Sequence, residues 1–235
     1  MGENSDRLSS VSFFCPAYHD EGNLPLLIPK VHKLLQEITD TFEIIIVEDG
    51  SPDKTAEVAD QLAKQFSNVR VIHHEKNQGY GAALRDGFLN AQYDYIFYTD
   101  GDNQYDVNEF KPYFKHLKDY DILNGYAIKK AVTPRRLVQS IVFNALTNIL
   151  FFSWFKDVNC SIKMYKSSVI KSMDIKCFSA FIDAEMLIKA KRLKFKIFDV
   201  PVTHYERKTG LASGSKFNVI WDTIKDMVRF RLGIL

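Results

Sequence analysis

The fold is decided by one stretch of the sequence: Tyr95-Ile96-Phe97-Tyr98-Thr99-Asp100-Gly101-Asp102. A short apolar run followed at once by acidic residues is typical of a buried strand that ends at a ligand site. Asp100 and Asp102 are two residues apart, so in extended backbone both side chains leave the same face. Two carboxylates on one face repel each other unless a divalent cation binds them. The stretch therefore predicts a strand that ends at a Mg²⁺ or Mn²⁺ site.

A second acidic cluster follows another apolar run earlier in the chain. Glu48 and Asp49 come directly after Phe42–Val47, which also predicts a buried strand. Capping of the next helix explains Ser51 and Asp53, but it does not explain two acids at the strand end. The carboxyl ends of neighbouring parallel strands meet at one edge, where open α/β sheets bind ligands. We therefore expect both clusters to line one site that binds a metal together with a nucleotide diphosphate.

The first hundred residues alternate between strand and helix patterns. The expected strands cover residues 11–15, 42–48, 69–73 and 95–100, and the expected helices cover 24–38, 55–66 and 82–91. Such alternation predicts a parallel sheet with right-handed crossovers. A length of 235 residues fits a single α/β domain.

The charge is distributed unevenly along the chain. Residues 1–100 hold 8 Lys and Arg against 16 Asp and Glu, whereas the remainder holds 23 against 13. A basic half beside an acidic metal-binding half fits an anionic acceptor or a membrane surface. A solvated basic surface explains the same charge equally well.

The cysteines and the N-terminus indicate a cytoplasmic protein. Cys15, Cys160 and Cys177 are odd in number and lack metal-ligand spacing, so we expect buried thiols in a reducing compartment. The first residues contain no apolar core and therefore do not form a signal peptide.

Two segments of the second half are candidates for contact with a membrane. Leu137–Phe155 carries no charge, but polar residues such as Asn144 and Asn148 interrupt it, and a spanning helix needs roughly 20 predominantly apolar residues. An interfacial or core helix is the better interpretation. Phe217–Leu235 is amphipathic, and either lies on an anionic bilayer or packs against the domain.

Several segments in a fixed order resemble family 2 glycosyltransferases, in particular the dolichol- and polyprenol-phosphate sugar synthases. These segments are Pro16–Leu24, Val47–Thr55, Asn77–Gly87, Asp100–Gln104, Asp157–Tyr165, Phe181–Ala190 and His204–Lys216. The resemblance implies a single type-A glycosyltransferase domain with a Rossmann-like, mostly parallel sheet flanked by helices. Residues 1–105 would bind the nucleotide sugar, residues 106–216 the acceptor, and residues 217–235 would form an amphipathic C-terminal helix.

The resemblance also implies roles for individual residues. Those expected around the base and ribose of the donor are Pro16, Ala17, Tyr18, Asp20, Val47, Glu48 and Asp49. The diphosphate and its metal would be held by Asp100, Gly101, Asp102 and Gln104. Arg207 and Lys216 match a basic pair that closes over phosphate, and Glu185 matches an acid on the acceptor side. The catalytic set is expected to be Asp102, Asp183, Glu185 and Arg207.

Three positions depart from the family pattern. His19-Asp20 stands where Asn-Glu is usual, and Glu48-Asp49 stands where Asp-Asp is usual. Both changes keep an acidic side chain and alter its length. An arginine expected after the strand that follows the metal motif is not evident, and Lys129 is the available cation.

The expected reaction moves a hexosyl group from a nucleotide-diphosphate sugar, of the GDP-mannose or UDP-glucose type, to a polyprenyl or dolichyl phosphate. The resemblance implies inversion at the anomeric carbon, and the metal would stabilise charge on the leaving diphosphate. A lipid phosphate is already ionised, so it needs cations rather than a strong base. Arg135 and Arg136, just before Leu137–Phe155, are expected to bind it, although they also fit a solvated helix start.

Alternative functions remain open at this point. If the acceptor is a sugar hydroxyl, Asp183 or Glu185 must take a proton. A non-catalytic nucleotide-sugar sensor or scaffold is a second alternative. A nucleotidyltransferase is a third and weaker one, because the glycine-rich basic loop after its first strand is absent. We expect a peripheral protein on the cytoplasmic face of a membrane that binds no nucleic acid.

Overall fold

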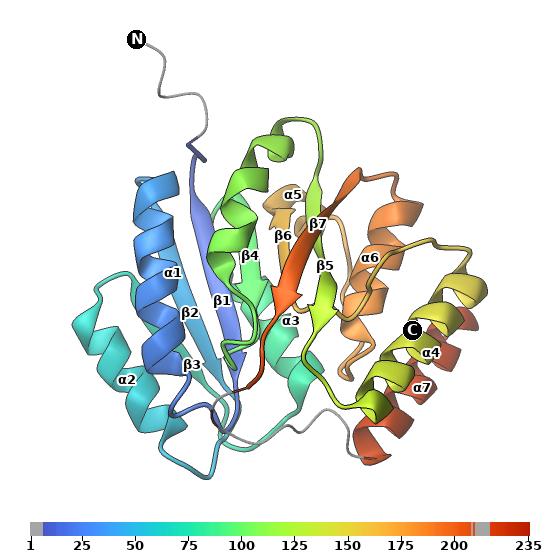
Figure 1. Ribbon diagram of the computed structural model, residues 1–235, viewed down its shortest axis with the longest axis horizontal. Coiled ribbons are helices and arrows are strands. Elements are labelled where there is room, and N and C mark those ends of the chain that lie inside the picture. The colour runs from blue at the N-terminus through green and yellow to red at the C-terminus, as the bar shows by residue number, and fades with distance from the viewer. Residues whose placement is uncertain (1–6, 208, 210–216) are drawn as a thin grey trace.

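The computed structural model describes residues 7–207, 209 and 217–235, and these residues form one α/β domain (Figure 1). The described strands join in one seven-stranded sheet in the order β3-β2-β1-β4-β6-β5-β7. The strands are β1 (Val11–Ala17), β2 (Phe42–Glu48), β3 (Val69–His73), β4 (Tyr95–Thr99), β5 (Ile122–Lys130), β6 (Ile162–Lys166) and β7 (Ile197–His204). The helices are α1 (Leu24–Ile38), α2 (Thr55–Gln65), α3 (Tyr80–Asn90), the 3₁₀ segment η1 (Val107–Lys118), α4 (Pro134–Phe151), α5 (Ser167–Lys171), α6 (Ile182–Arg192) and α7 (Phe217–Arg231).

The first half forms the parallel sheet that the sequence predicts. β1 lies between β2 and β4 and is parallel to both, and β3 continues the sheet beyond β2. Ala17 pairs with Glu48, so β1 and β2 end at the same edge. In the second half β6 runs antiparallel to β4 and β5, whereas β5 and β7 are parallel. The sheet is therefore mostly parallel.

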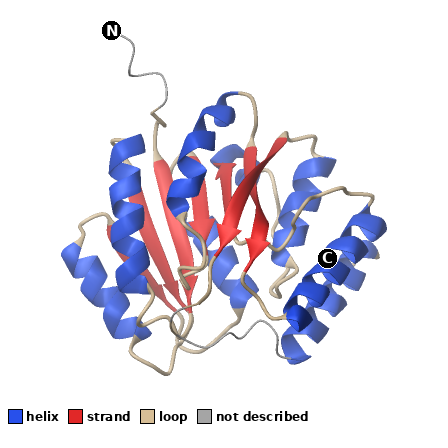
Figure 2. Ribbon diagram, viewed as in Figure 1, coloured by secondary structure: helices blue, strands red, loops and turns tan. Residues whose placement is uncertain are grey.

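Helices cover both faces of the sheet (Figure 2). The alternating side chains of β1 divide the core: Phe13 belongs to the cluster under α1, α2 and η1, and Phe14 belongs to the cluster under α3 and α6. Burial on both faces explains why the strands of the first half appear in the sequence as nearly continuous apolar runs.

The helices α4 and α7 lie at the side of the domain beyond β5 (Figure 1). Phe230 of α7 packs against Phe151 of α4 and Phe181, with 5.6 Å between ring centroids in both pairs. Both expected segments of the second half are therefore helical. Among the described helices, none has the length and apolarity needed to cross a membrane.

Gly87 is the position where α3 approaches the sheet most closely. A Cβ added there would lie 2.2 Å from the ring of Phe14, which is fully buried. We expect Gly87→Ala to lower the free energy of unfolding by about 1–3 kcal/mol, because this clash outweighs the gain of about 1 kcal/mol in helix propensity. Denaturant unfolding measures the change.

A second substitution separates the clash from other effects of the alanine. Phe14→Leu removes part of the ring, so the double variant should lose less stability than the two single variants together. Additive losses would show that the approach of α3 to Phe14 is not the cause.

Candidate active site

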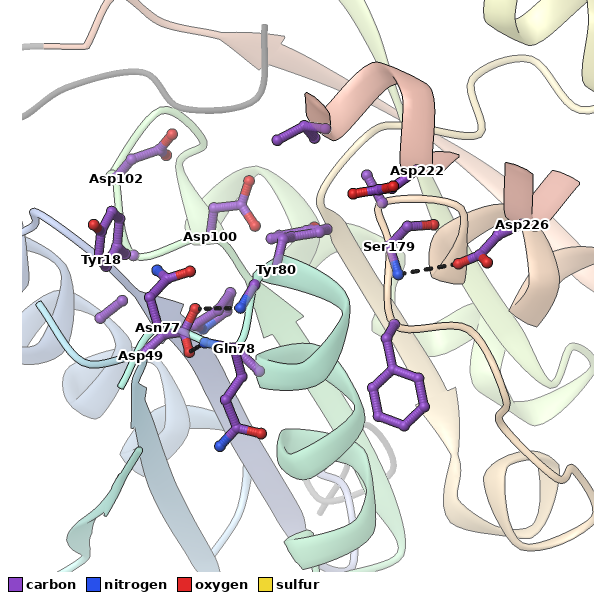
Figure 3. Close-up of a pocket in the computed structure, with 18 of the residues that line it drawn as sticks. Tyr18, Asp49, Asn77, Gln78, Tyr80, Asp100, Asp102, Ser179, Asp222 and Asp226 are labelled. Carbon is purple, nitrogen blue, oxygen red and sulfur yellow. Dashed lines mark hydrogen bonds between the residues drawn. The ribbon is translucent and has the colours of Figure 1, made fainter. Parts of the chain in front are cut away.

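A cavity of about 930 Å³ opens at the carboxyl ends of the parallel strands, at the lower edge of the sheet in Figure 1. It extends from the ends of β1 and β4 to α7, and Figure 3 shows part of its lining. Of the residues expected at the site, those that line it are Pro16, Ala17, Tyr18, Asp20, Asp49, Asp100, Gly101, Asp102, Gln104, Arg136 and Arg207. The structure brings these side chains together at the sheet edge where the strands β1, β2 and β4 end.

The turn after β4 brings its two aspartates into the cavity. The backbone N–H of Gly101 donates to the carbonyl of Pro16 at 3.0 Å, and a Cβ on Gly101 would lie 2.7 Å from that carbonyl oxygen. The glycine therefore allows the turn to lie directly on the end of β1. Asn103 has a φ of 56°, a left-handed conformation that asparagine tolerates better than most residues. These constraints explain the spacing of the acidic pair.

Asp100 is a partly buried carboxylate, and one of its oxygens is both buried and unsatisfied. Among the described residues, its Oδ1 has no hydrogen-bond partner. Burial, and then the charge of Asp102, raise the pKa of Asp100 to about 8, and hydrogen bonding from Ser161 and Tyr80 opposes this shift. A buried carboxylate of this kind is stabilised either by a proton or by a cation. Its chemistry fits a divalent metal ion.

The other possible ligands are Asp102 and Gln104. Asp102 Oδ1 accepts the backbone N–H of Gln104 at 3.1 Å, and Gln104 Nε2 donates to the carbonyl of Tyr205 at 2.8 Å. The described residues contain no group of three or more His, Cys, Asp and Glu side chains arranged to hold a metal ion. Two carboxylates with an amide oxygen are nevertheless a set that Mg²⁺ accepts when substrate phosphates complete its coordination.

Arg207, which follows β7, pairs with the acidic centre. Its Nη2 lies 2.9 Å from Asp102 Oδ2 and 3.8 Å from Asp20 Oδ1. Burial lowers the pKa of Arg207, but the attraction of Asp102 and Asp20 outweighs this, and the net shift is upward. The guanidinium is thus a permanent positive charge beside the two aspartates. Lys216, its expected partner, lies outside the described residues.

The loop after β1 is organised by Asp20. Its carboxylate accepts the backbone N–H of Tyr18 at 3.1 Å and the side chain of Asn23 at 2.9 Å. Burial raises the pKa of Asp20, and these hydrogen bonds and Arg207 oppose the shift. Tyr18 and Asp20 therefore face the cavity from a closed, hydrogen-bonded loop.

The second acidic cluster is divided between two roles. Asp49 lines the cavity, and its carboxylate accepts the backbone N–H groups of Gln78 and Gly79 at 2.7 and 2.9 Å (Figure 3). His74 lies 2.7 Å from Asp49 and 2.9 Å from Asp86. Asp49 therefore holds the loop that begins α3.

Glu48 is 2% exposed and accepts the backbone N–H of Ser51 at 2.6 Å. Val47 is fully buried in the core beneath α3. Neither is among the described residues that line the cavity, because Glu48 closes the strand end and Val47 packs in the core. The sequence correctly located the cluster, but it assigned both acids and Val47 to the donor.

Asp183 and Glu185 lie in the first turn of α6, and neither is among the described residues that line the cavity. Asp183 Oδ1 is 2.7 Å from Lys163 Nζ, in a pair of which the lysine is fully buried. Glu185 is also fully buried, and it accepts the backbone N–H groups of Lys176 and Cys177 at 2.9 and 2.8 Å. The expectation that either takes a proton from an acceptor is therefore not supported, because both carboxylates are occupied by structural partners.

The structure only partly brings together the basic residues expected at the site, which are Arg135 and Arg136 for the acceptor and Lys129 for the donor. Arg136 lines the cavity from the first turn of α4. Arg135 and Lys129 are exposed, and neither belongs to the cavity lining that the structure describes. Successive residues of a helix point about 100° apart, so the two adjacent arginines leave α4 in different directions.

Sequence reasoning missed the wall of the cavity opposite the aspartates. Phe178 and Ser179 line it, together with Asp222 and Asp226 of α7, and Asp226 accepts the backbone N–H of Ser179 at 3.3 Å (Figure 3). One signal is present in the sequence, the small residue Gly81 near the start of α3. A Cβ there would lie 2.3 Å from the carbonyl of Phe178.

A mostly parallel sheet with paired aspartates at the end of β4 and an arginine beside them defines a glycosyltransferase of the type-A fold. The chain belongs to glycosyl transferase family 2, whose model matches residues 12–174. The fold is also that of glucosyl-3-phosphoglycerate synthase from Mycobacterium tuberculosis, solved with Mn²⁺, UDP and glucosyl-3-phosphoglycerate. The TM-score is 0.71 at 17% identity, over 96% of this chain and 80% of that one.

Two curated relatives act on lipid phosphates, as their names state. A dolichyl-phosphate beta-glucosyltransferase of Trichomonas vaginalis is 26% identical over 95% of this chain and 75% of its own length. An undecaprenyl-phosphate 4-deoxy-4-formamido-L-arabinose transferase of Photorhabdus laumondii is 28% identical over 87% of this chain and 63% of its own length.

The raised pKa of Asp100, caused by burial and by the charge of Asp102, makes the stability of the protein depend on pH, and its amide variant should lack this dependence. Folded Asp100 stays protonated up to about pH 8, whereas in the unfolded chain it ionises near its ordinary pKa of 3.8. The folded state binds more protons across this window, so the stability of the metal-free protein falls as pH rises through it. Asp100→Asn should match the wild type at the acidic end and melt at a higher temperature at the alkaline end.

Thermal unfolding in the presence of a chelator measures both curves. Added Mn²⁺ should raise the melting temperature of the wild type at the alkaline end and leave the variant unchanged. A wild-type curve no steeper than that of Asp100→Asn would contradict the assigned environment of this carboxylate.

Proposed function

We propose that the protein transfers a hexose with inversion from a nucleotide-diphosphate sugar to a polyprenyl or dolichyl phosphate, and that the reaction requires Mg²⁺ or Mn²⁺. The observation that carries this proposal is the composition of a single cavity. Asp100 and Asp102 line it together with Arg136, and Arg136 begins a helix with an apolar outward face. The names of the two lipid-phosphate relatives agree with the proposal.

The donor would lie along the strand ends. Asp100 and Asp102, with Gln104, would hold the metal, which when bound stabilises negative charge on the leaving diphosphate. Arg207 supplies a second positive charge at Asp102, so it is placed to neutralise phosphate oxygens. Tyr18 and the loop held by Asp49 would enclose the base and ribose.

The acceptor proposed here needs no base. A phosphate monoester is already ionised at neutral pH, so its oxygen can attack without losing a proton in the same step. Asp183 and Glu185, the carboxylates that a sugar hydroxyl would require, are held by buried partners. The guanidinium of Arg136, in the first turn of α4, would bind the phosphate.

The lipid part of the acceptor would follow α4. The outward residues of this helix and the loop after it are large, apolar and 40–78% exposed: Leu137, Val138, Ile141, Val142, Leu146, Ile149, Phe152 and Trp154. α7 adds Trp221, Ile224 and Val228. We name these residues the α4–α7 apolar surface. A surface of this kind, with Arg135 and Lys129 near its start, fits a peripheral contact with an anionic bilayer on its cytoplasmic face.

The lipid-phosphate acceptor predicts a difference between the two adjacent arginines. A charge-assisted hydrogen bond contributes about 1.5–3 kcal/mol, so Arg136→Gln should raise the KM for polyprenyl phosphate about tenfold or more. Arg135→Gln is the matched control, because it removes the same charge outside the cavity, and it should change this KM much less. Transfer of label from a radioactive nucleotide sugar into the organic phase, in detergent, measures both.

The same assay distinguishes the alternatives. Label that enters an oligosaccharide and never the organic phase would replace the lipid acceptor with a sugar hydroxyl. Nucleotide-sugar binding without any turnover would indicate a sensor.

The membrane contact can be tested separately from chemistry. Ile141→Ser combined with Ile149→Ser changes two residues that are 59% and 64% exposed, so the fold should be retained. We expect this variant to bind vesicles of anionic phospholipid more weakly, while its transfer to a short-chain, water-soluble prenyl phosphate stays at the wild-type rate. Equal sedimentation of wild type and variant with the vesicles would exclude α4 from the contact.

A further inference from the structure

The segment that follows β7 is joined at Tyr205 to the loop after β4. The backbone N–H of Tyr205 donates to the carbonyl of Gln104 at 2.8 Å, and Gln104 Nε2 donates to the carbonyl of Tyr205 at 2.8 Å. One residue earlier, His204 forms an isolated antiparallel bridge with Tyr105. The end of β7 and the loop that carries the two aspartates therefore lie side by side.

These contacts are part of a closed ring of hydrogen bonds at Asp102. Asp102 Oδ1 accepts the backbone N–H of Gln104 at 3.1 Å, and Asp102 Oδ2 lies 2.9 Å from Arg207 Nη2. Arg207 is two residues beyond Tyr205, so the ring is completed along the chain. The position of the Tyr205 backbone therefore limits where the guanidinium of Arg207 can reach.

Glu109, in the first turn of η1, holds the same segment from outside the cavity. Its Oε2 accepts the backbone N–H of Thr203 at 2.7 Å, and its Oε1 accepts the hydroxyl of Tyr205 at 2.8 Å. β7 is an edge strand of the sheet that the structure describes, so its outer backbone groups have no partner strand. Glu109 is not among the described residues that line the cavity. Its carboxylate thus fixes the end of β7, two residues before Arg207, without facing the substrate.

We propose that Glu109 is a positioning residue, which fixes the end of β7 so that Arg207 lies beside Asp102 and binds the diphosphate of the donor. The inference rests on the proposed function, because it requires a metal-bound diphosphate at this place. A segment that is already ordered loses less conformational entropy when the ligand binds, so the affinity is higher. Glu109 supplies this order through Thr203 and Tyr205.

The role requires two hydrogen bonds and no negative charge. In Glu109→Gln the amide oxygen can accept the N–H of Thr203, and the amide N–H can donate to the hydroxyl oxygen of Tyr205. Glu109→Ala removes both contacts. Both variants lose the same charge, so a comparison of the two separates positioning from a direct electrostatic effect of Glu109 on the site.

Binding of inorganic pyrophosphate in the presence of saturating Mn²⁺, measured by calorimetry, tests the site without turnover and without the base. We expect Glu109→Ala to weaken this binding about tenfold, as is usual for loss of a group that orients a ligand, and Glu109→Gln to stay within about threefold of the wild type. Lys111→Gln is the matched control, because it breaks a contact of η1 with Glu37 that does not involve β7. This control should bind pyrophosphate like the wild type.

A double-mutant cycle tests whether the effect passes through Arg207. Once Arg207→Gln has removed the guanidinium, Glu109→Ala should cause little further loss of affinity. Additive losses, or equal losses in Glu109→Ala and Glu109→Gln, would overturn the inference.

Thermal unfolding of the same variants separates positioning from stability. Wild-type affinity in Glu109→Ala would also overturn the inference, and a lower melting temperature would then show that Glu109 acts on stability alone. Failure of the wild type to bind pyrophosphate with Mn²⁺ would instead contradict the proposed function, and the inference with it.

Discussion

The repulsion between Asp100 and Asp102 is the constraint around which the site is built. Packing of Gly101 on the end of β1 brings the two carboxylates together, although burial makes their negative charge costly. Arg207 offsets part of this charge at Asp102. The unsatisfied oxygen of Asp100 is left for a cation. A cation bound here, as the proposed function requires, would relieve the repulsion between the two ionised carboxylates.

Much of the first half of this fold could be predicted because its signals are local. Val69–His73 forms the strand that was expected there, and Leu24–Ile38 forms the expected helix. Buried parallel strands are apolar runs, and the acids at their ends mark the sheet edge that binds ligands. The family and the type-A fold were identified from the order of these segments, and both are confirmed.

The direction of individual side chains could not be predicted, because it depends on contacts far apart in sequence. Asp183 and Glu185 occupy an acidic helix start that is equally compatible with a catalytic pair. Asp183 is held away from the cavity by Lys163. Glu185 is held away from it by the backbone N–H groups of Lys176 and Cys177. Likewise Arg135 and Arg136 are equivalent in sequence, and only the rotation of α4 against the domain separates them. The antiparallel direction of β6 likewise could not be predicted, because no local sequence pattern indicates it.

α7 has three functional faces on four turns of helix. Met227 and Phe230 pack into the core, Asp222 and Asp226 line the cavity, and Trp221 and Val228 belong to the α4–α7 apolar surface. Few positions on such a helix are free to vary, since almost every substitution alters the core face, the cavity face or the exposed apolar face. Trimming the chain ahead of Phe217, a natural choice when designing a shorter protein for crystallisation, would therefore remove the packing partner of Phe151 and Phe181 together with one side of the cavity.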